Sequence, residues 1–284
     1  MDGTLLKGLR LLETLAHSPK PRGVSDLARE LDLTRSNVHR TLQTLCAAGF
    51  VRVAEQKGNY ECTFKLLELS SAIMERVDVV RCASLYMQRL SEATEETVHL
   101  AAPSGAEVVY LHKVEGPQPV RAYSSIGGRA PAQCVASGKA LIAWRTEREL
   151  DRDFVEPMPR YTPLTIGDRP TLAAEVARIR VDGYAVNQGE WRDSVGGVAA
   201  PVVNMFGEVQ AAVGVSGPIE RIRLRSTEMY HDAVREAAER ISRDLGCLDY
   251  QDALTRLRMR IEADNAKDSA EADVTDDKTS AGVR

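Results

Sequence analysis

The feature that most constrains the fold is a pair of short helices joined by a tight turn near the N-terminus. Apolar residues at helical spacing predict three helices, which are Thr4–His17, Asp26–Leu31 and Thr34–Ala48. Ser25 is the expected N-cap of the second helix, and only Asp32 and Leu33 separate the second helix from the third. Two helices that follow one another so closely are typical of a helix-turn-helix.

The third helix has one apolar face and one polar face. Val38, Leu42 and Leu45 lie within about 60° of one another at 100° per residue. Arg40 lies on the opposite face, and no acidic residue occurs from 34 to 54. A solvated surface is the usual meaning of a polar stripe. Here, however, a short helix comes directly before the third helix and can support it. The acid-free face of the third helix therefore favours contact with the phosphates and base edges of duplex DNA.

Two short strands, at 50–54 and 59–63, are expected after the third helix, with a turn between them. Together the three helices and the hairpin predict a winged helix-turn-helix domain over residues 1–63. The expected DNA-binding residues are Thr34, Arg35, Ser36, Asn37, His39, Arg40, Gln43, Arg52 and Lys57.

The distribution of charge argues against a non-specific DNA binder. Residues 1–63 carry nine basic and seven acidic residues, so the predicted DNA-binding domain is only mildly basic. Residues 262–284 carry seven acidic and three basic residues, within a chain of net charge -4. Their composition predicts a disordered acidic tail within the last segment, 251–284.

The remainder of the chain predicts a helical linker and then an α+β domain. Helical periodicity in two pieces covers 64–93, and a domain with a central antiparallel or mixed sheet is expected over 94–250. The expected strands are 98–101, 107–114, 119–123, 184–187, 198–204 and 209–216. The expected helices are 136–145, 147–154, 172–181 and 227–245.

Enzymatic and metal-binding patterns are weak. The five cysteines are scattered, which disfavours structural disulfides and zinc, and Cys134 has no neighbouring base to activate it. Ser137-Gly138-Lys139 is not a phosphate loop, because Gln133 stands where that motif requires glycine. Trp191 either lines a ligand pocket or packs in the core, and the sequence favours neither.

No signal peptide or membrane span is visible. We therefore expect a cytoplasmic protein with no catalytic residues, metal or cofactor. A small-acid hydrolase or lyase built on the second domain is the rival hypothesis.

Several motifs, taken in order, resemble those of a known family over roughly residues 4–250. The N-terminal motifs are Lys7–Leu12, Ser25–Ala28, Ser36–Leu42 and Gly49–Val51, and the C-terminal motifs are Ile126–Pro131, Ala136–Ala140, Asp182–Tyr184, Gly196–Val202 and Ser216–Pro218. The sequence is identified by these motifs as a member of the IclR family of bacterial transcriptional regulators. Within that family, it most resembles repressors of pectin and sugar-acid breakdown.

The resemblance implies a GAF-like effector domain, a double-stranded DNA operator and a homodimer or a tetramer formed as a dimer of dimers. It also implies repression of a catabolic operon, controlled by a small organic acid such as a sugar acid. An aromatic-acid-responsive activator of the same family is the alternative. By motif position, the implied effector-binding residues are Ala136, Ser137, Asn187, Glu190, Val195, Gly197, Gly214 and Ser216. Asn187 and Gly197 differ from the acid and the cysteine of some members.

Overall fold

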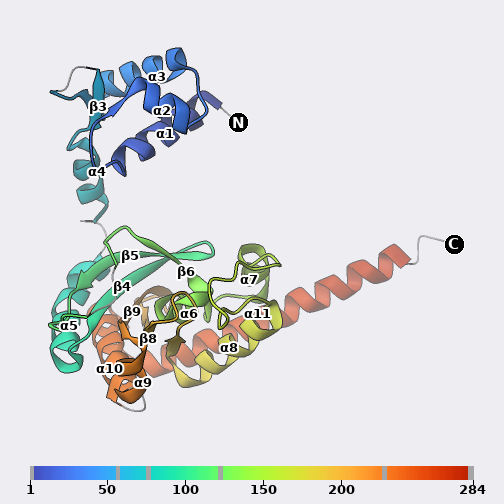
Figure 1. Ribbon diagram of the computed structural model, residues 1–284. Coiled ribbons are helices and arrows are strands. Elements are labelled where there is room, and N and C mark those ends of the chain that lie inside the picture. The colour runs from blue at the N-terminus through green and yellow to red at the C-terminus, as the bar shows by residue number, and fades with distance from the viewer. Residues whose placement is uncertain (1–2, 56–57, 75–77, 121–123, 226–228, 281–284) are drawn as a thin grey trace. The chain divides into compact units, whose positions relative to one another are not determined.

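The computed structural model describes residues 3–55, 58–74, 78–120, 124–225 and 229–280 (Figure 1). The chain divides into two compact units, residues 1–77 and 78–284. The segment expected as a linker, 64–93, is divided between them. Helix α4 (Lys65–Met74) belongs to the first unit, and helix α5 (Asp78–Thr94) packs on the sheet of the second.

The first unit is a winged helix-turn-helix. Its elements are α1 (Gly3–Ala16), β1 (Arg22–Gly23), α2 (Val24–Glu30), α3 (Arg35–Ala47), β2 (Val51–Val53), β3 (Asn59–Cys62) and α4. The strands form an antiparallel sheet in the order β1-β3-β2. Leu11, Leu27, Val38 and Leu42 are fully buried between the helices. These side chains hold α3 against α1 and α2, so that the polar face of α3 points outward.

Two local details of this unit differ from the expectation. Helix α2 begins at Val24 with Gly23 as its N-cap and no side-chain capping bond, so Ser25 lies within the first turn instead of capping it. Strand β1 has only two residues, which is too short for a sequence pattern to predict. It becomes a strand because Arg22 and Gly23 pair with Tyr60 and Asn59.

The second unit is an α+β domain built on a six-stranded antiparallel sheet. The strands are β4 (Thr97–Ser104), β5 (Glu107–Val114), β6 (Arg129–Pro131), β7 (Ala185–Gln188), β8 (Val195–Val203) and β9 (Val209–Pro218), in the order β6-β5-β4-β9-β8-β7. Helix α10 (Met229–Asp244) packs against β8, β9 and α5. Helix α6 (Ala136–Ile142) lies against β4, β7, β8 and β9. Helices η1 (Ala132–Cys134), α7 (Glu147–Asp153), α8 (Arg169–Asp182) and α9 (Ile219–Arg225) also belong to the domain.

The expected strand at 119–123 is not found in its described part. Residues 119–120 are a bend, and 121–123 lie outside the described residues. Strand β6 and helix α9 were not expected from the sequence. Among the described residues, no helix is long and apolar enough to cross a membrane.

The expectation of a disordered tail from residue 262 differs from the structure. Helix α11 runs from Tyr250 to Ser280 (Figure 1). Leu254, Leu257 and Ile261 are buried along one face of its first half, and the Asn265 side chain accepts a hydrogen bond from the Glu147 backbone at 2.9 Å. Anchoring of its first half supplies the helical nucleus, and a helix extends from an existing nucleus more easily than it begins.

Candidate functional site

Helix α3 presents the residues expected to face DNA. Its N-cap Thr34 accepts a hydrogen bond from the Asn37 backbone at 3.3 Å. Thr34, Arg35, Ser36, His39, Arg40 and Gln43 are exposed, and Asn37 is half-buried. Because Val38 and Leu42 are fully buried on the opposite side, the helix cannot rotate without exposing its core face.

The basic side chains on this face have no acidic partners among the described residues. Arg35, His39 and Arg40 form no ion pair with any residue that the structure describes. Arg40 donates to the Asn37 side chain at 3.3 Å, which orients its guanidinium along the helix. Charges left unpaired on an exposed face remain available for phosphates or base edges.

Two further residues expected to contact DNA, Arg52 and Lys57, lie outside α3. Arg52 on β2 forms an ion pair with Glu61 on β3, with 2.7 Å between the charged groups. The positive charge of Arg52 is therefore largely compensated within the wing. Lys57 lies outside the described residues.

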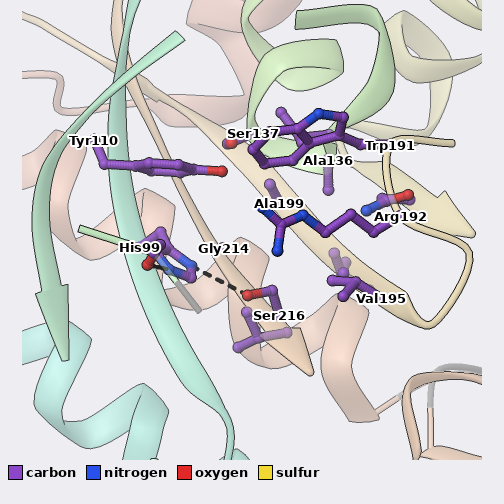
Figure 2. Close-up of a pocket in the computed structure, with 16 residues that line it drawn as sticks. His99, Tyr110, Ala136, Ser137, Trp191, Arg192, Val195, Ala199, Gly214 and Ser216 are labelled. Carbon is purple, nitrogen blue, oxygen red and sulfur yellow. Dashed lines mark hydrogen bonds between the residues drawn. The ribbon is translucent and has the colours of Figure 1, made fainter. Parts of the chain in front are cut away.

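A cavity lies between the sheet and helix α6 in the second unit (Figure 2). The space open to the centres of water molecules is about 60 Å³. Its lining comes from β4, β5, β7, β8, β9, α6 with its N-cap, the loop before β6 and the loop before β8. The lining residues are His99, Tyr110, Ser124, Val135, Ala136, Ser137, Asn187, Trp191, Arg192, Val195, Gly197, Val198, Ala199, Gly214, Val215 and Ser216.

Strand register brings the floor of the cavity together. Gly214 on β9 pairs with His99 on β4 and with Ala199 on β8, so these three residues share one face of the sheet. A Cβ atom on Gly214 would lie 2.5 Å from the Ala199 Cβ. Glycine is therefore required for the strands to approach so closely at this point.

The polar groups of the floor are already hydrogen bonded to one another. The His99 ring contacts the Ser216 hydroxyl at 3.2 Å through Nδ1 and the Ser124 hydroxyl through Nε2. Burial, aided by the charge of Lys113, lowers the pKa of His99 to about 4. Tyr110 hydrogen bonds to Ser137, and burial raises its pKa to about 12. Both groups are thus neutral at pH 7.

A tightly held loop forms the other wall. The Asn187 side chain accepts hydrogen bonds from the backbones of Gly189 at 2.9 Å and Glu190 at 3.2 Å. The Thr162 hydroxyl donates to the Gly189 carbonyl at 2.8 Å, and that of Thr165 donates to the Glu190 carbonyl at 2.6 Å. The loop is thereby fixed from behind, while Trp191 and Arg192 face the cavity (Figure 2).

Glu190 itself points away from the cavity. Its carboxylate binds the buried ammonium of Lys139 at 2.7 Å, and Glu175 on α8 binds the same ammonium at 2.9 Å. The resemblance places Glu190 at the effector, but it is not among the lining residues. In the structure it positions the loop, because its second oxygen accepts a hydrogen bond from the Gln188 backbone at 2.5 Å.

The other residues implied by the resemblance do line the cavity, and they are Ala136, Ser137, Asn187, Val195, Gly197, Gly214 and Ser216. The motif around Ser137 has a packing explanation as well. A Cβ atom on Gly138 would overlap the Ala132 backbone, so glycine lets α6 lie against η1. Helix α6 has only seven residues, and its dipole is correspondingly weak.

Sequence reasoning missed four polar or aromatic lining residues, which are His99, Tyr110, Ser124 and Arg192, and it left Trp191 undecided. His99 and Tyr110 lie on strands that the sequence predicted. Among the described residues, no other lining residue comes from β4 or β5, so alternation along these strands did not indicate which face meets the cavity. Arg192 and Trp191 lie in an irregular loop, where no periodicity indicates which side chains point inward.

The described residues contain little that would support an enzymatic reaction. No group of three or more His, Cys, Asp or Glu side chains could hold a metal ion in the described part of the chain. Burial, together with the charge of Glu190, raises the pKa of the Cys134 thiol to about 12. A thiol that stays protonated at pH 7 is a poor nucleophile.

Comparison with known proteins gives a consistent result for both units. The family model for the IclR helix-turn-helix domain matches residues 4–55, and that for the bacterial transcriptional regulator IclR C-terminal matches residues 71–243. HTH-type transcriptional regulator KdgR of Dickeya chrysanthemi is 32% identical over 248 residues, which are 87% of this chain and 81% of that protein. HTH-type transcriptional repressor AllR of Salmonella typhi is 33% identical over 243 residues, which are 85% of this chain and 89% of that protein.

Solved structures resemble most of the chain. The Thermotoga maritima IclR structure is 31% identical with a TM-score of 0.71, and the match covers 87% of this chain and 100% of that one. An IclR homolog of Microbacterium hydrocarbonoxydans, complexed with 4-hydroxybenzoate, is 25% identical with a TM-score of 0.75. That match covers 86% of this chain and 99% of the other.

Proposed function

The chain belongs to the IclR family of DNA-binding transcriptional regulators, and from this premise we propose that it represses a catabolic operon until a small organic acid fills the cavity. The relatives are regulators and not enzymes, so the hydrolase or lyase hypothesis is set aside. The observation that carries the proposal is the presence, in one chain, of an acid-free exposed helix face in the first unit and a cavity with polar and apolar lining in the second.

The DNA side of the proposal assigns α3 to the major groove of an operator. Arg40 and Gln43 are the residues that can reach base edges, and Ser36 and Thr34 can bond phosphate oxygens. Arg35, Asn37 and His39 flank that face. We propose that the protein binds as a homodimer, or as a dimer of dimers, to an operator with two-fold symmetry. The two DNA-binding domains of a dimer would then each contact one half-site. The protein acts in the cytoplasm, where this DNA is found.

The effector side rests on the cavity and on one structural neighbour. The neighbour from Microbacterium hydrocarbonoxydans holds 4-hydroxybenzoate, an organic acid. The cavity of this chain has a polar floor and an apolar flank, as expected for a small polar ligand. Release of the operator follows if the acid favours an arrangement of the DNA-binding heads that no longer matches the half-sites.

Selection from a pool of random duplexes tests the DNA side. We expect enrichment of an inverted repeat, with an affinity that falls steeply as salt increases, because phosphates supply much of the binding free energy. Equal binding to all duplexes would contradict the proposal and would indicate an architectural DNA binder instead.

A blocked cavity tests the effector side. A thermal-shift screen over sugar acids and aromatic acids identifies the acids that stabilise the wild type. Ser216→Trp fills the cavity floor and should abolish their effect on operator release while operator binding persists. Thr255→Trp, at an exposed position on α11, is the matched control. An undiminished response in Ser216→Trp would refute this placement of the effector.

The same screen separates two effector classes. An activator would respond to aromatic acids through this cavity. Transcription of a reporter gene would then rise only when the protein and the acid are both present. The 4-hydroxybenzoate complex of the neighbour favours this second candidate. Reporter transcription that rises on deletion of the protein supports the repressor.

A further inference from the structure

The cavity lining carries a single charged side chain among the described residues. Of the 16 lining residues, Arg192 alone is ionised at pH 7, and none is aspartate or glutamate. The guanidinium reaches into the space between the Trp191 ring and Ser216 (Figure 2). It lies 4.9 Å from the centre of that ring, so one of its faces is already covered.

Arg192 has no carboxylate of its own within the described chain. It forms no ion pair with any residue described in the structure. The nearby Glu190 is held at 2.7 Å by Lys139 and is thus unavailable. The Arg192 carbonyl accepts a hydrogen bond from the Val195 backbone at 2.9 Å, which closes a turn and fixes the backbone that carries the side chain. Arg192 is exposed, so its guanidinium, which lies over Trp191 and has no carboxylate partner among the described residues, can bind an anion that enters the cavity from solvent.

The opposite end of the cavity is polar but neutral. His99 lies between the hydroxyls of Ser124 and Ser216 and carries no charge at pH 7. It therefore adds no second cation that could bind a second carboxylate. Each serine hydroxyl can make a further hydrogen bond, either as donor or as acceptor. This end suits a hydroxyl or an oxo oxygen.

Cavity size limits the length of the ligand. A space of about 60 Å³ for the centres of water molecules holds roughly four to six waters, since one water needs about 10–15 Å³ by this measure. An acid of two to four carbons matches this volume. A six-carbon sugar acid or an aromatic acid exceeds this volume, so part of it would have to extend past the exposed Arg192 into solvent.

We propose that Arg192 determines effector specificity by binding the carboxylate of a short hydroxy- or oxo-monocarboxylic acid, whose oxygen substituent bonds to Ser124 and Ser216. This inference rests on the proposed function of the cavity as the effector site. It adds the charge, the length and the orientation of the ligand, and it assigns a residue that the family resemblance does not include.

The test uses the full-length protein without DNA and four probes at pH 7. Lactate is the expected type of ligand, lactamide is its neutral counterpart, propionate lacks the hydroxyl, and malonate carries a second carboxylate. Binding is followed by the shift in melting temperature and by tryptophan fluorescence, because the two tryptophans of the chain, Trp144 and Trp191, both lie in the second unit. The variants are Arg192→Gln and Ser216→Ala. Arg148→Gln, at an exposed position on α7 outside the cavity lining, is the control.

The expected results are specific to each end of the ligand. Lactate binds the wild type and Arg148→Gln, and lactamide and malonate bind at least about 10-fold more weakly. Arg192→Gln lowers lactate affinity by about 10- to 100-fold and removes the preference over lactamide, as loss of a charge-assisted hydrogen bond requires. Ser216→Ala removes the preference for lactate over propionate.

Three outcomes overturn the inference, which are equal binding of lactate and lactamide by the wild type, unchanged lactate binding by Arg192→Gln, and binding of none of the three acids. Operator binding of every variant is measured in parallel. If an acid from the wider screen releases the operator through the Ser216 site while Arg192→Gln responds normally, the proposed function stands and the role of Arg192 falls. If the wild type binds no operator, the proposed function fails independently of the ligand data.

Discussion

The proposed DNA-binding face of α3 and the proposed effector cavity are built in opposite ways. The face is a single helix whose functional side chains follow one another in sequence, with cations that are exposed and unpaired among the described residues. The cavity draws side chains from strands, a helix and a loop between residues 99 and 216, and most of its polar groups are bonded to one another.

This difference separates two ways in which a protein prepares for a ligand. DNA supplies its own dense charge and geometry, so an exposed helix held by Val38 and Leu42 is sufficient. A small acid has few atoms with which to order a site, so the site must already be ordered. The cavity accordingly depends on supporting contacts, such as Lys139 with Glu190, whose side chains do not line it.

The largest effect is expected from removal of that support. Lys139→Met leaves Glu190 buried without a cation, and we expect the second unit to lose about 3–5 kcal/mol of unfolding free energy. Urea denaturation followed by tryptophan fluorescence measures it, since both tryptophans lie in that unit. Lys267→Met, whose exposed pair with Asp264 contributes little, is the control. A loss below about 1 kcal/mol would mean that the loop is held by other contacts.

The next effect concerns DNA. Arg40→Ala should weaken operator binding by about 2–3 kcal/mol, or roughly 30- to 150-fold, and flatten the preference among sequences, because a base contact is lost. Gel-shift titration measures the affinity, and light scattering should show an unchanged oligomer. Arg256→Ala on α11 serves as the control for loss of one exposed positive charge. Normal operator binding by Arg40→Ala would show that α3 is not the recognition helix.

A smaller effect is expected from acid. The pKa of His99 is about 4 in the folded protein, whereas a fully solvated histidine has a pKa of 6.5, so the unfolded chain binds more protons between these values. Stability from this group is complete above pH 6.5 and decreases as the pH falls towards 4. Between pH 6.5 and 5.5 we expect the second unit to lose about 1 kcal/mol. His99→Gln should remove this part of the pH dependence, and an unaltered slope in that variant would contradict the assignment.

The smallest effect compares two arginines of the DNA-binding unit. Arg52 is neutralised by Glu61, whereas Arg40 has no acidic partner among the described residues. Arg52→Ala should therefore change operator affinity by less than about 3-fold. Glu61→Gln, by freeing Arg52 for a phosphate, should increase affinity by up to about 3-fold. A loss in Arg52→Ala as large as in Arg40→Ala would show that the ion pair opens on DNA.

Much of the fold follows from local patterns. Helical periodicity and the acid-free stretch predicted the winged helix-turn-helix, and the family model confirms the domain. Alternating apolar residues located most of the strands of the second unit. Short elements were missed where pairing alone creates them, as for Arg22 and Gly23 in β1. The tail expected to be disordered from residue 262 is part of α11, because burial of Leu254, Leu257 and Ile261 anchors that helix.

The cavity shows where sequence reasoning stops. Motif resemblance placed Gly214 and Ser216 in the lining, but it also placed Glu190 there, and the structure turns that carboxylate towards Lys139. Arg192 gave no signal at all, since a loop has no period from which an inward side chain can be predicted.

The sequence by itself determined the helices and strands, the outward face of α3 and the family, because each depends on the spacing of nearby residues or on ordered motifs. Only the tertiary structure decided which polar groups of the cavity are hydrogen bonded to one another and which remain available to a ligand. That division depends on distances between segments up to 117 residues apart, as between His99 and Ser216, and no local pattern encodes it.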